Sequence, residues 1–183
     1  MDNIIIDKIL KYINNGKHFK YYLGVFTIKE YNTLDLKNKK CFSLILFISN
    51  ISKNLGHFVT IFKSKNKIFF CDSYGKNLKY YKIKIKNIKF FLDYKLQSKN
   101  TTICGAYSIF FVHLISLCKY KITCFKKIFL NFFNLKKKVF LNDKYIKNYI
   151  FLIYPKLNNK DCKYLFCNEN FIINYQKCQK ILC

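Results

Sequence analysis

The uncharged stretch from Ile103 to Cys118 limits the fold more than any other feature of this chain. It has small residues early, including Gly105, Ala106 and Ser108, and large apolar residues later. The stretch is long for a strand and too apolar for a helix with one face in solvent. It is also shorter than the ~18 to 20 residues needed to cross a bilayer. We therefore predict a helix from Cys104 to about Leu117 that is buried against a sheet.

Apolar segments upstream supply strands for that sheet. Cys41 to Ile51 is rich in β-branched and aromatic residues, which predicts a buried strand. Gly56 to Ile61 and Lys67 to Cys71 flank the polar sequence Lys-Ser-Lys-Asn, which predicts an antiparallel hairpin in the same sheet. Tyr21 to Ile28 is a short apolar stretch around Gly24 that suits either a strand or a loop.

The remaining segments predict helices and leave one region open. Residues 1–15 are expected to form an opening helix, and Phe125 to Phe133 and Lys144 to Ile153 have amphipathic helical patterns. Residues 82–91 suit either a strand or a helix. No internal repeat or Gly/Ser/Pro-rich linker divides the chain, so we expect one domain over residues 1–183. The expected class is α+β, with a small, mainly antiparallel sheet packed against the central helix.

The basic excess of the chain has two interpretations that the sequence leaves open. The chain has 34 lysines, no arginine and nine acidic residues, which gives a net charge of +25. Lysine, Asn, Ile, Phe and Tyr are residues that A/T-rich codons supply, so part of the excess is a genomic bias. The lysines either form a solvated surface or bind a polyanion such as nucleic acid. The candidate polyanion-binding positions are Lys119, Lys121, Lys126, Lys127, Lys136, Lys137 and Lys138.

Cysteine usage favours a reducing compartment. Nine cysteines are an odd number, and they lack the spacing of a compact disulfide framework. Two Cys-x4-Cys pairs near the C-terminus lack the flanking glycines of zinc sites, so no metal is predicted. These pairs are Cys162, Cys167, Cys178 and Cys183. Charged residues interrupt the N-terminal segment, so it does not resemble a secretory signal, and no transmembrane segment or membrane partner is expected.

Four residues can form one reactive site: His57 on the first hairpin strand, Asp72 at the end of the second, Gln97 in a loop and Cys104 at the start of the central helix. A cysteine attacks as the thiolate, and a helix N-terminus and a nearby imidazolium both lower its pKa. His57 can supply that imidazolium and protonate a leaving amine, while Asp72 fixes the tautomer of its ring. The Gln97 side chain and the Cys104 backbone amide can donate to an oxyanion. The structural alternative for Cys104 is a small buried residue on a packed helix.

Two other histidines and one cysteine are expected to be structural. His113 lies nine residues beyond Cys104, roughly 13 Å along a helix, which predicts a core histidine. His18 has no acidic neighbour, which favours a surface or loop position. Cys71 adjoins Asp72, but strand alternation directs its side chain to the opposite face, into the core.

The local sequences around the four candidate residues resemble the adenovirus maturation protease (adenain-like) family, which has relatives in virophages and Polinton-like elements. The resemblance rests on GHFVTIF, CDSYG and the Gln-x6-Cys-Gly block LQSKNTTICGAYSIFFVHLI, with FKYYLGVFTIKEY following the first helix. It extends over about residues 1–157. It implies a papain-like or adenain-like fold with the central helix carrying the nucleophile. The same blocks place Gly56, Phe58 and Gly105 beside the substrate.

The chain departs from the family pattern at three points. Phe58 stands where the family has tryptophan, and we expect it to keep the ring packing on the imidazole. Asp72 stands for the adenoviral glutamate, although aspartate is usual in the wider clan. Adenoviral enzymes are activated by a viral peptide, disulfide-linked to a cysteine upstream of the nucleophile. No cysteine lies between Cys71 and Cys104, which argues against that linkage here.

The resemblance implies a cysteine endopeptidase that processes viral capsid or core precursor proteins during virion maturation, at glycine-containing sites. No cofactor is required for the chemistry, but viral DNA and a viral peptide are candidate activators. The implied location is the virion and the host cytoplasm, at the viral factory, or the nucleus. One alternative is a protease for ubiquitin-like modifiers, which shares the residue order. Another is a nonenzymatic, basic nucleic-acid-binding virion protein on a decayed protease fold.

Overall fold

The computed structural model describes residues 2–17, 19–49, 56–83, 85, 88–90, 94–133 and 139–155. Over these residues the chain has an α+β fold with one mixed sheet and helices packed against it. The strands are β1 (Tyr22–Thr27), β2 (Phe42–Ser49), β3 (Gly56–Ser64), β4 (Lys67–Cys71) and β5 (Ile88–Phe90). The helices are α1 (Asn3–Ile13), α2 (Ile28–Thr33), α3 (Cys104–Leu117), α4 (Ile122–Phe132) and α5 (Val139–Ile153).

The sheet is mixed, so the prediction of a mainly antiparallel sheet holds for its central strand pairs and fails at its two edges. Its five described strands lie in chain order, and the central strand pairs β2–β3 and β3–β4 are antiparallel. The outer pairs β1–β2 and β4–β5 are parallel. Parallel neighbours need a crossover connection, and α2 lies in the one between β1 and β2. The apolar pattern of a strand carries no direction, so the sequence did not reveal these two parallel edges.

The short helix α2 was also missed, although the sequence contains its start signal. Thr27 accepts a hydrogen bond from the Glu30 amide at 3.3 Å, and the Glu30 carboxylate accepts one from the Thr27 amide at 2.7 Å. This reciprocal capping box satisfies two backbone donors at the helix start. A Thr-x-x-Glu pattern at residues 27–30 was therefore a usable helix signal.

The predicted hairpin is confirmed. β3 and β4 pair from Thr60 opposite Cys71 to Ser64 opposite Lys67, which leaves a two-residue turn. Lys65 in that turn has a φ of 55°, as tight hairpin turns require. The predicted strand at 41–51 and the ambiguous segment at 21–28 become β2 and β1. In the ambiguous segment at 82–91, residues 88–90 form β5.

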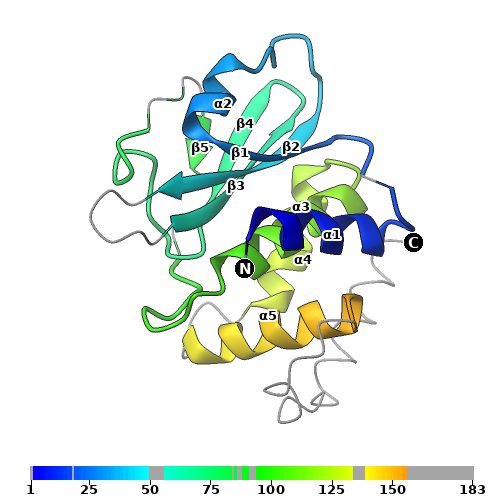
Figure 1. Cartoon of the computed structure of the whole chain (residues 1–183), viewed down its shortest axis with the longest axis vertical. Coiled ribbons are helices and arrows are strands. Elements are labelled where there is room, and N and C mark those ends of the chain that lie inside the picture. The colour runs from blue at the N-terminus through cyan, green and yellow to red at the C-terminus, as the bar shows by residue number, and fades with distance from the viewer. Residues whose placement is uncertain are drawn as a thin grey trace.

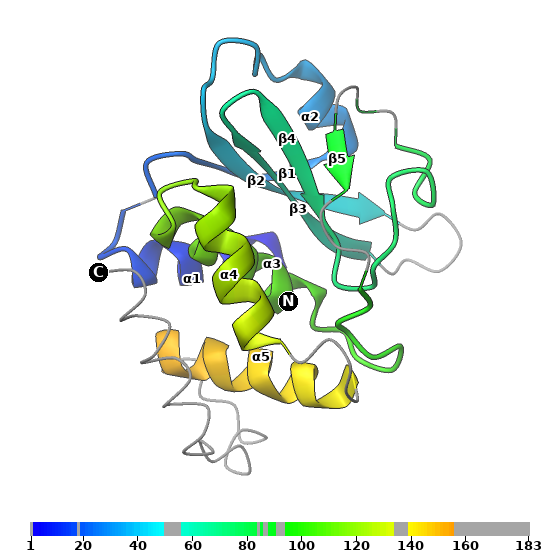
Figure 2. The same ribbon diagram turned by 180° about the vertical axis from the view of Figure 1, so that it is seen from behind.

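Helix α3 is buried as predicted and organises the larger apolar core. Residues Cys104 to Ile115 are all buried, which fits a helix that is apolar on every side. Figures 1 and 2 show α3 enclosed between the sheet, α1, α4 and α5. Side chains such as Phe62 and Phe69 extend from the sheet into this core, while Leu44 and Ile61 face a second core on the other side. The predicted helices at the N-terminus, at 125–133 and at 144–153 correspond to α1, α4 and α5.

Candidate active site

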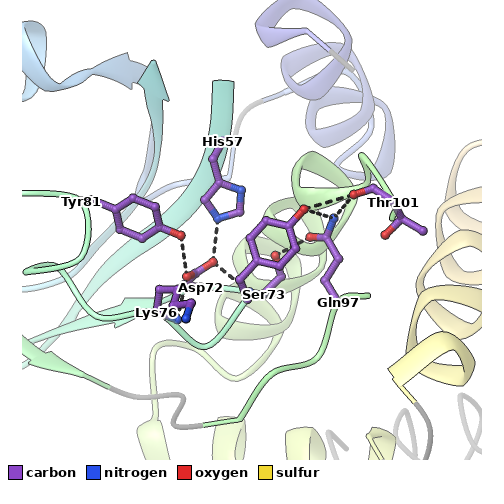
Figure 3. A network of polar contacts seen from close by, with 8 residues as sticks. His57, Asp72, Ser73, Lys76, Tyr81, Gln97 and Thr101 are labelled. Carbon is purple, nitrogen blue, oxygen red and sulfur yellow. Dashed lines mark hydrogen bonds and ion pairs between the residues drawn. The ribbon is translucent and has the colours of Figure 1, made fainter. Parts of the chain in front are cut away.

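His57 and Asp72 meet at one end of the hairpin. His57 is the second residue of β3, and Asp72 directly follows β4. The antiparallel pairing of the two strands brings these positions together, and His57 Nε2 lies 2.6 Å from Asp72 Oδ1 (Figure 3). The Asp72 side chain is completely buried, and the His57 side chain is 12% exposed. The predicted imidazole–carboxylate contact is therefore present.

The Asp72 carboxylate is held in place by three further donors. Oδ1 accepts the Tyr74 backbone amide at 3.0 Å, while Oδ2 accepts the Lys76 amide at 2.9 Å and the Tyr81 hydroxyl at 2.8 Å. With His57, the carboxylate thus accepts four hydrogen bonds, which satisfies a fully buried acid. This network orients Oδ1 toward the imidazole.

Two tyrosine rings stack on His57, in the role that the sequence assigned to Phe58. The centroid of the imidazole lies 4.8 Å from that of Tyr74 and 5.6 Å from that of Tyr81, and both pairs are nearly parallel. Phe58 instead is buried in the core and packs against Phe47 at 5.1 Å. The expectation for Phe58 was wrong because alternation along β3 turns its side chain away from that of His57.

Cys104 is the first residue of α3 and is 8% exposed. Burial raises the pKa of its thiol, but the polar contact with His57, the His57 charge and the backbone amides of Phe58 and Gly105 outweigh burial. The pKa of Cys104 is therefore lowered. An amide at the start of a helix stabilises a thiolate in the same way as it binds other anions.

The pKa of His57 moves in the opposite direction. Burial lowers it, but the hydrogen bond to Asp72, the polar contact with Cys104 and the charges of both groups raise the pKa to about 9. Nε2 faces Asp72, and Nδ1 is buried without a conventional hydrogen bond to the described residues. Nδ1 is therefore the ring nitrogen open to the sulfur of Cys104. A loose contact of this kind is common in unliganded sites.

Gln97 is fully buried, and both ends of its amide are engaged. Its Oε1 accepts the Ser73 hydroxyl at 2.6 Å, and Nε2 donates to the Thr101 carbonyl at 2.7 Å (Figure 3). Nε2 also donates to the Tyr74 hydroxyl at 3.2 Å, the longer of its two contacts. The backbone amides of Leu96 and Gln97 both donate to the Ser73 carbonyl at 2.8 Å. Gln97 is thus tied to the turn that follows Asp72.

A buried carboxylate that sequence reasoning missed, Asp143 of α5, anchors the loop after Gln97. Asp143 Oδ2 accepts the Ser98 amide at 3.1 Å, the Ser98 hydroxyl at 2.5 Å and the Thr101 hydroxyl at 3.2 Å. Its Oδ1 accepts the Tyr107 hydroxyl of α3 at 2.9 Å. Asp143 is only 5% exposed. Its signal was an acid just before the predicted helix start, which the sequence alone does not connect with residues 98–107.

The glycines predicted to lie beside the substrate have local structural roles as well. A Cβ on Gly56 would lie 1.8 Å from the ring of Phe47, so the close approach of that ring requires glycine. Gly105 is buried in the first turn of α3, and its amide acts on Cys104. Whether either residue contacts a substrate stays a prediction, as it does for Phe58.

The structure places the other predicted residues away from this chemistry or leaves them undescribed. His113 is a core residue, as predicted, hydrogen-bonded through Nδ1 to the Tyr149 hydroxyl, and Cys71 is fully buried. His18, the cysteine pairs at residues 162–183 and three of the candidate lysines, Lys136 to Lys138, lie outside the described residues. The other four lysines are exposed on α4 and the turn before it: Lys119, Lys121, Lys126 and Lys127.

The site thus brings together the Cys104 thiol, the His57 imidazole and the Asp72 carboxylate, with the buried Gln97 amide nearby.

No model of a known protein family matches the chain, and no curated protein matches its sequence. Within the described residues, no three or more His, Cys, Asp or Glu side chains are grouped as metal ligands would be. No described helix has both the length and the apolar composition to cross a membrane.

Proposed function

We propose that the chain is a cysteine endopeptidase of papain-like or adenain-like fold that processes capsid or core precursor proteins during virion maturation. One observation carries this proposal: His57 lies between Asp72 and Cys104, with its pKa raised to about 9 while that of Cys104 is lowered. These opposite shifts favour a thiolate–imidazolium pair at neutral pH. An ordinary thiol, with a pKa of ~8.5, would be almost wholly protonated there.

The first chemical step is attack of the Cys104 thiolate on the scissile carbonyl carbon, which forms a C–S bond and a tetrahedral oxyanion. Collapse of this intermediate breaks the C–N bond, and His57 transfers its proton to the departing amine. Water then attacks the thioester, with His57 now accepting a proton, and the acid product leaves with the thiolate restored. Asp72 holds Nε2 throughout, which keeps Nδ1 directed at the reacting atoms.

Gln97 supplies an oxyanion donor in this scheme, together with the backbone amide of Cys104. Both Gln97 amide hydrogens are engaged, so one existing hydrogen bond must break when substrate binds. The contact with the Tyr74 hydroxyl at 3.2 Å is the longer one and is the one we expect to be exchanged. Tyr74 keeps a second partner, the Thr101 carbonyl at 3.1 Å, so this exchange leaves its hydroxyl satisfied.

The viral substrate is supported by the resemblance of the blocks around His57, Asp72, Gln97 and Cys104 to the adenovirus maturation proteases. That resemblance also supports cleavage near glycine, location in the virion and at viral assembly sites, and viral DNA or a peptide as activators. The exposed lysines of α4 suit the DNA part of this proposal. A protease for ubiquitin-like modifiers is the second candidate, favoured by the same triad order and Gln97.

The test compares substrates and measures the thiol directly. Purified protein is incubated with a capsid precursor from a virophage or Polinton-like element, and in parallel with a ubiquitin-like conjugate, with Cys104→Ala as the inactive control. Cleavage of the precursor alone supports the proposal, whereas cleavage of the conjugate alone favours the second candidate. Iodoacetamide labelling at pH 6 with peptide mapping tests for a decayed site. Uniform slow labelling of all cysteines would contradict any cysteine protease function.

A further inference from the structure

A cleft of about 610 Å³ opens beside the catalytic histidine, and its walls are basic and aromatic. His57 forms part of the lining, together with Tyr74, Tyr80 and Tyr81. Three lysines complete the cationic wall: Lys76, Lys95 and Lys99. None of these lysines belongs to the candidate polyanion-binding set on α4, so this is a separate basic region.

The lysines are positioned by the same hydrogen bonds that build the catalytic site. The Lys76 backbone amide donates a hydrogen bond to Asp72, the carboxylate that also binds His57 (Figure 3). The backbone of Lys76 is therefore held close to the imidazole. Lys95 directly precedes Leu96, whose amide is bound to the Ser73 carbonyl. A Cβ on Gly75 would lie 2.9 Å from the backbone of Tyr94, so the two segments pack too tightly for any larger residue.

The third lysine is fixed from the other side of the site. Lys99 lies between Ser98 and Thr101, and both of these residues are anchored to Asp143. The backbones carrying all three ammonium groups are thus ordered before any ligand binds. Preorganised charge of this kind loses less conformational entropy on binding than charge on a free loop.

The charge of this cleft is not neutralised within the described part of the chain. The ion pair found there joins His57 and Asp72, and Asp72 is fully buried with all its acceptor positions used. Lys76 Nζ lies over the Tyr80 ring at 4.9 Å, a contact that leaves its charge in place. Carboxylates are the ligands that complement such a surface.

We propose that this cleft binds acidic side chains of the polypeptide substrate, within a few residues of the scissile bond. The inference rests on the proposed protease function, because His57 must reach the leaving amine while the cleft is occupied. That requirement favours a peptide over nucleic acid, since a strand lying against His57 would block the reaction. The hydroxyl of Tyr80 can donate a hydrogen bond to a carboxylate oxygen, whereas those of Tyr74 and Tyr81 already donate to Thr101 and Asp72.

Binding of a defined peptide tests the inference without any need for cleavage. The protein is Cys104→Ala, and the probe is a fluorescein-labelled peptide with the central sequence Glu-Glu-Gly-Gly-Glu-Glu, followed by fluorescence anisotropy. The matched probe has Gln in place of each Glu. The cleft variant carries Lys76→Gln, Lys95→Gln and Lys99→Gln. A control variant carries Lys119→Gln, Lys121→Gln and Lys127→Gln. It also loses three positive charges, but far from His57.

We expect the Glu peptide to bind more tightly than the Gln peptide, and the cleft variant to weaken its binding about tenfold, as three partly exposed charge pairs would. The control variant should change binding less than twofold. Equal losses in the two variants, or equal binding of both peptides, would overturn the inference. So would a labelled oligothymidylate that binds more tightly than the Glu peptide and loses its binding only in the cleft variant.

Cleavage by the protein with Cys104 intact separates this inference from the proposed function. If the cleft acts as inferred, the cleft variant raises KM for the Glu peptide and leaves kcat unchanged, the pattern of a uniform binding loss. If the peptide binds selectively in the cleft but no substrate is ever cleaved, the protease proposal fails while the binding site stands. If cleavage occurs with no preference for acidic peptides, the acidic-peptide site is contradicted while the protease proposal stands.

Discussion

The described residues include two histidines near the same helix, and their pKa values are shifted in opposite directions. His57 lies on β3 and faces Cys104 at the start of α3, and the Asp72 and Cys104 contacts raise its pKa to about 9. His113 lies within α3, and burial lowers its pKa to about 4. Both rings contact aromatic neighbours, Tyr74 for His57 and Phe19 for His113. Neither burial nor aromatic packing therefore distinguishes the two environments.

The difference comes from the groups that face each ring nitrogen. His113 contacts the neutral hydroxyl of Tyr149, which offers nothing to offset the cost of burying a charge. His57 contacts the buried carboxylate of Asp72 and the thiol of Cys104, and both favour the charged imidazole. Of these two histidines, the pKa is raised only for the one that has an acid buried beside it.

The largest effect is expected from removing the histidines one at a time. His57→Ala should lower kcat/KM for a cleaved peptide by at least about 10⁴-fold, because nucleophile activation and protonation of the leaving amine are both lost. Labelling of Cys104 at pH 6 should fall by about 10²-fold, toward the rate of an ordinary thiol. His113→Gln, which keeps a partner for Tyr149, should leave both rates within a few-fold. Equal losses of kcat/KM and of labelling in the two variants would show that the two histidines do not differ in function.

The next effect concerns the charge of Asp72. The activity of the unmodified protein should fall as pH rises through about 9, because His57 then loses the proton that it donates to the amine. Asp72→Asn removes the negative charge, so the pKa of His57 falls and the alkaline limb of the pH–rate profile moves to lower pH. The rate at neutral pH should drop by up to about 10⁴-fold. An unchanged alkaline limb would show that another group controls it.

A smaller effect is expected for the oxyanion donor. Gln97→Ala should reduce kcat by about 10²- to 10³-fold, the usual cost of losing one such donor. Iodoacetamide labelling of Cys104 at pH 6 should be unchanged, because alkylation forms no oxyanion. Tyr74→Phe keeps the ring on His57 but removes the hydroxyl that occupies Gln97, so kcat should stay within a few-fold. A parallel loss of labelling in Gln97→Ala would assign the residue to general folding instead.

The smallest effect is expected for the anchor of the loop. Asp143→Asn cannot accept all the hydrogen bonds from Ser98, Thr101 and Tyr107. The loop that carries Gln97 should then shift, and kcat should fall by roughly tenfold, as small displacements of catalytic groups do. Labelling of Cys104 should stay near its original rate, and circular dichroism should confirm the fold. If labelling falls in step with kcat, Asp143 does not act through Gln97.

The parts of the site that were predictable lie at the ends of strongly patterned segments. Cys104 starts a helix whose uncharged composition marks it as buried, and the hairpin brings His57 near Asp72 through local pairing alone. Gln97 was predicted from its spacing and family resemblance, and it is buried beside the same turn. The predictions failed at the parallel edges of the sheet, because local pattern does not specify chain direction. They also missed α2, although its Thr-x-x-Glu start signal is present in the sequence.

The residues that support the site could not have been predicted in the same way. Tyr74 and Tyr81 stack on His57, and Asp143 contacts Ser98 from 45 positions away. These contacts depend on how the loops after β4 and before α3 pack, and no periodicity records that packing. The same is true of the basic cleft, because its lysines are ordinary members of a lysine-rich sequence until the fold places them beside His57.

The sequence by itself determined a buried helix beginning at Cys104 and a hairpin ending at Asp72, because hydrophobic burial and local pairing depend on residues close together in the chain. Only the tertiary structure decided that the pKa of His57 is raised while that of His113 is lowered. That outcome depends on which groups face each ring across distant segments, and the cost of a buried charge is set by those groups rather than by the residue itself.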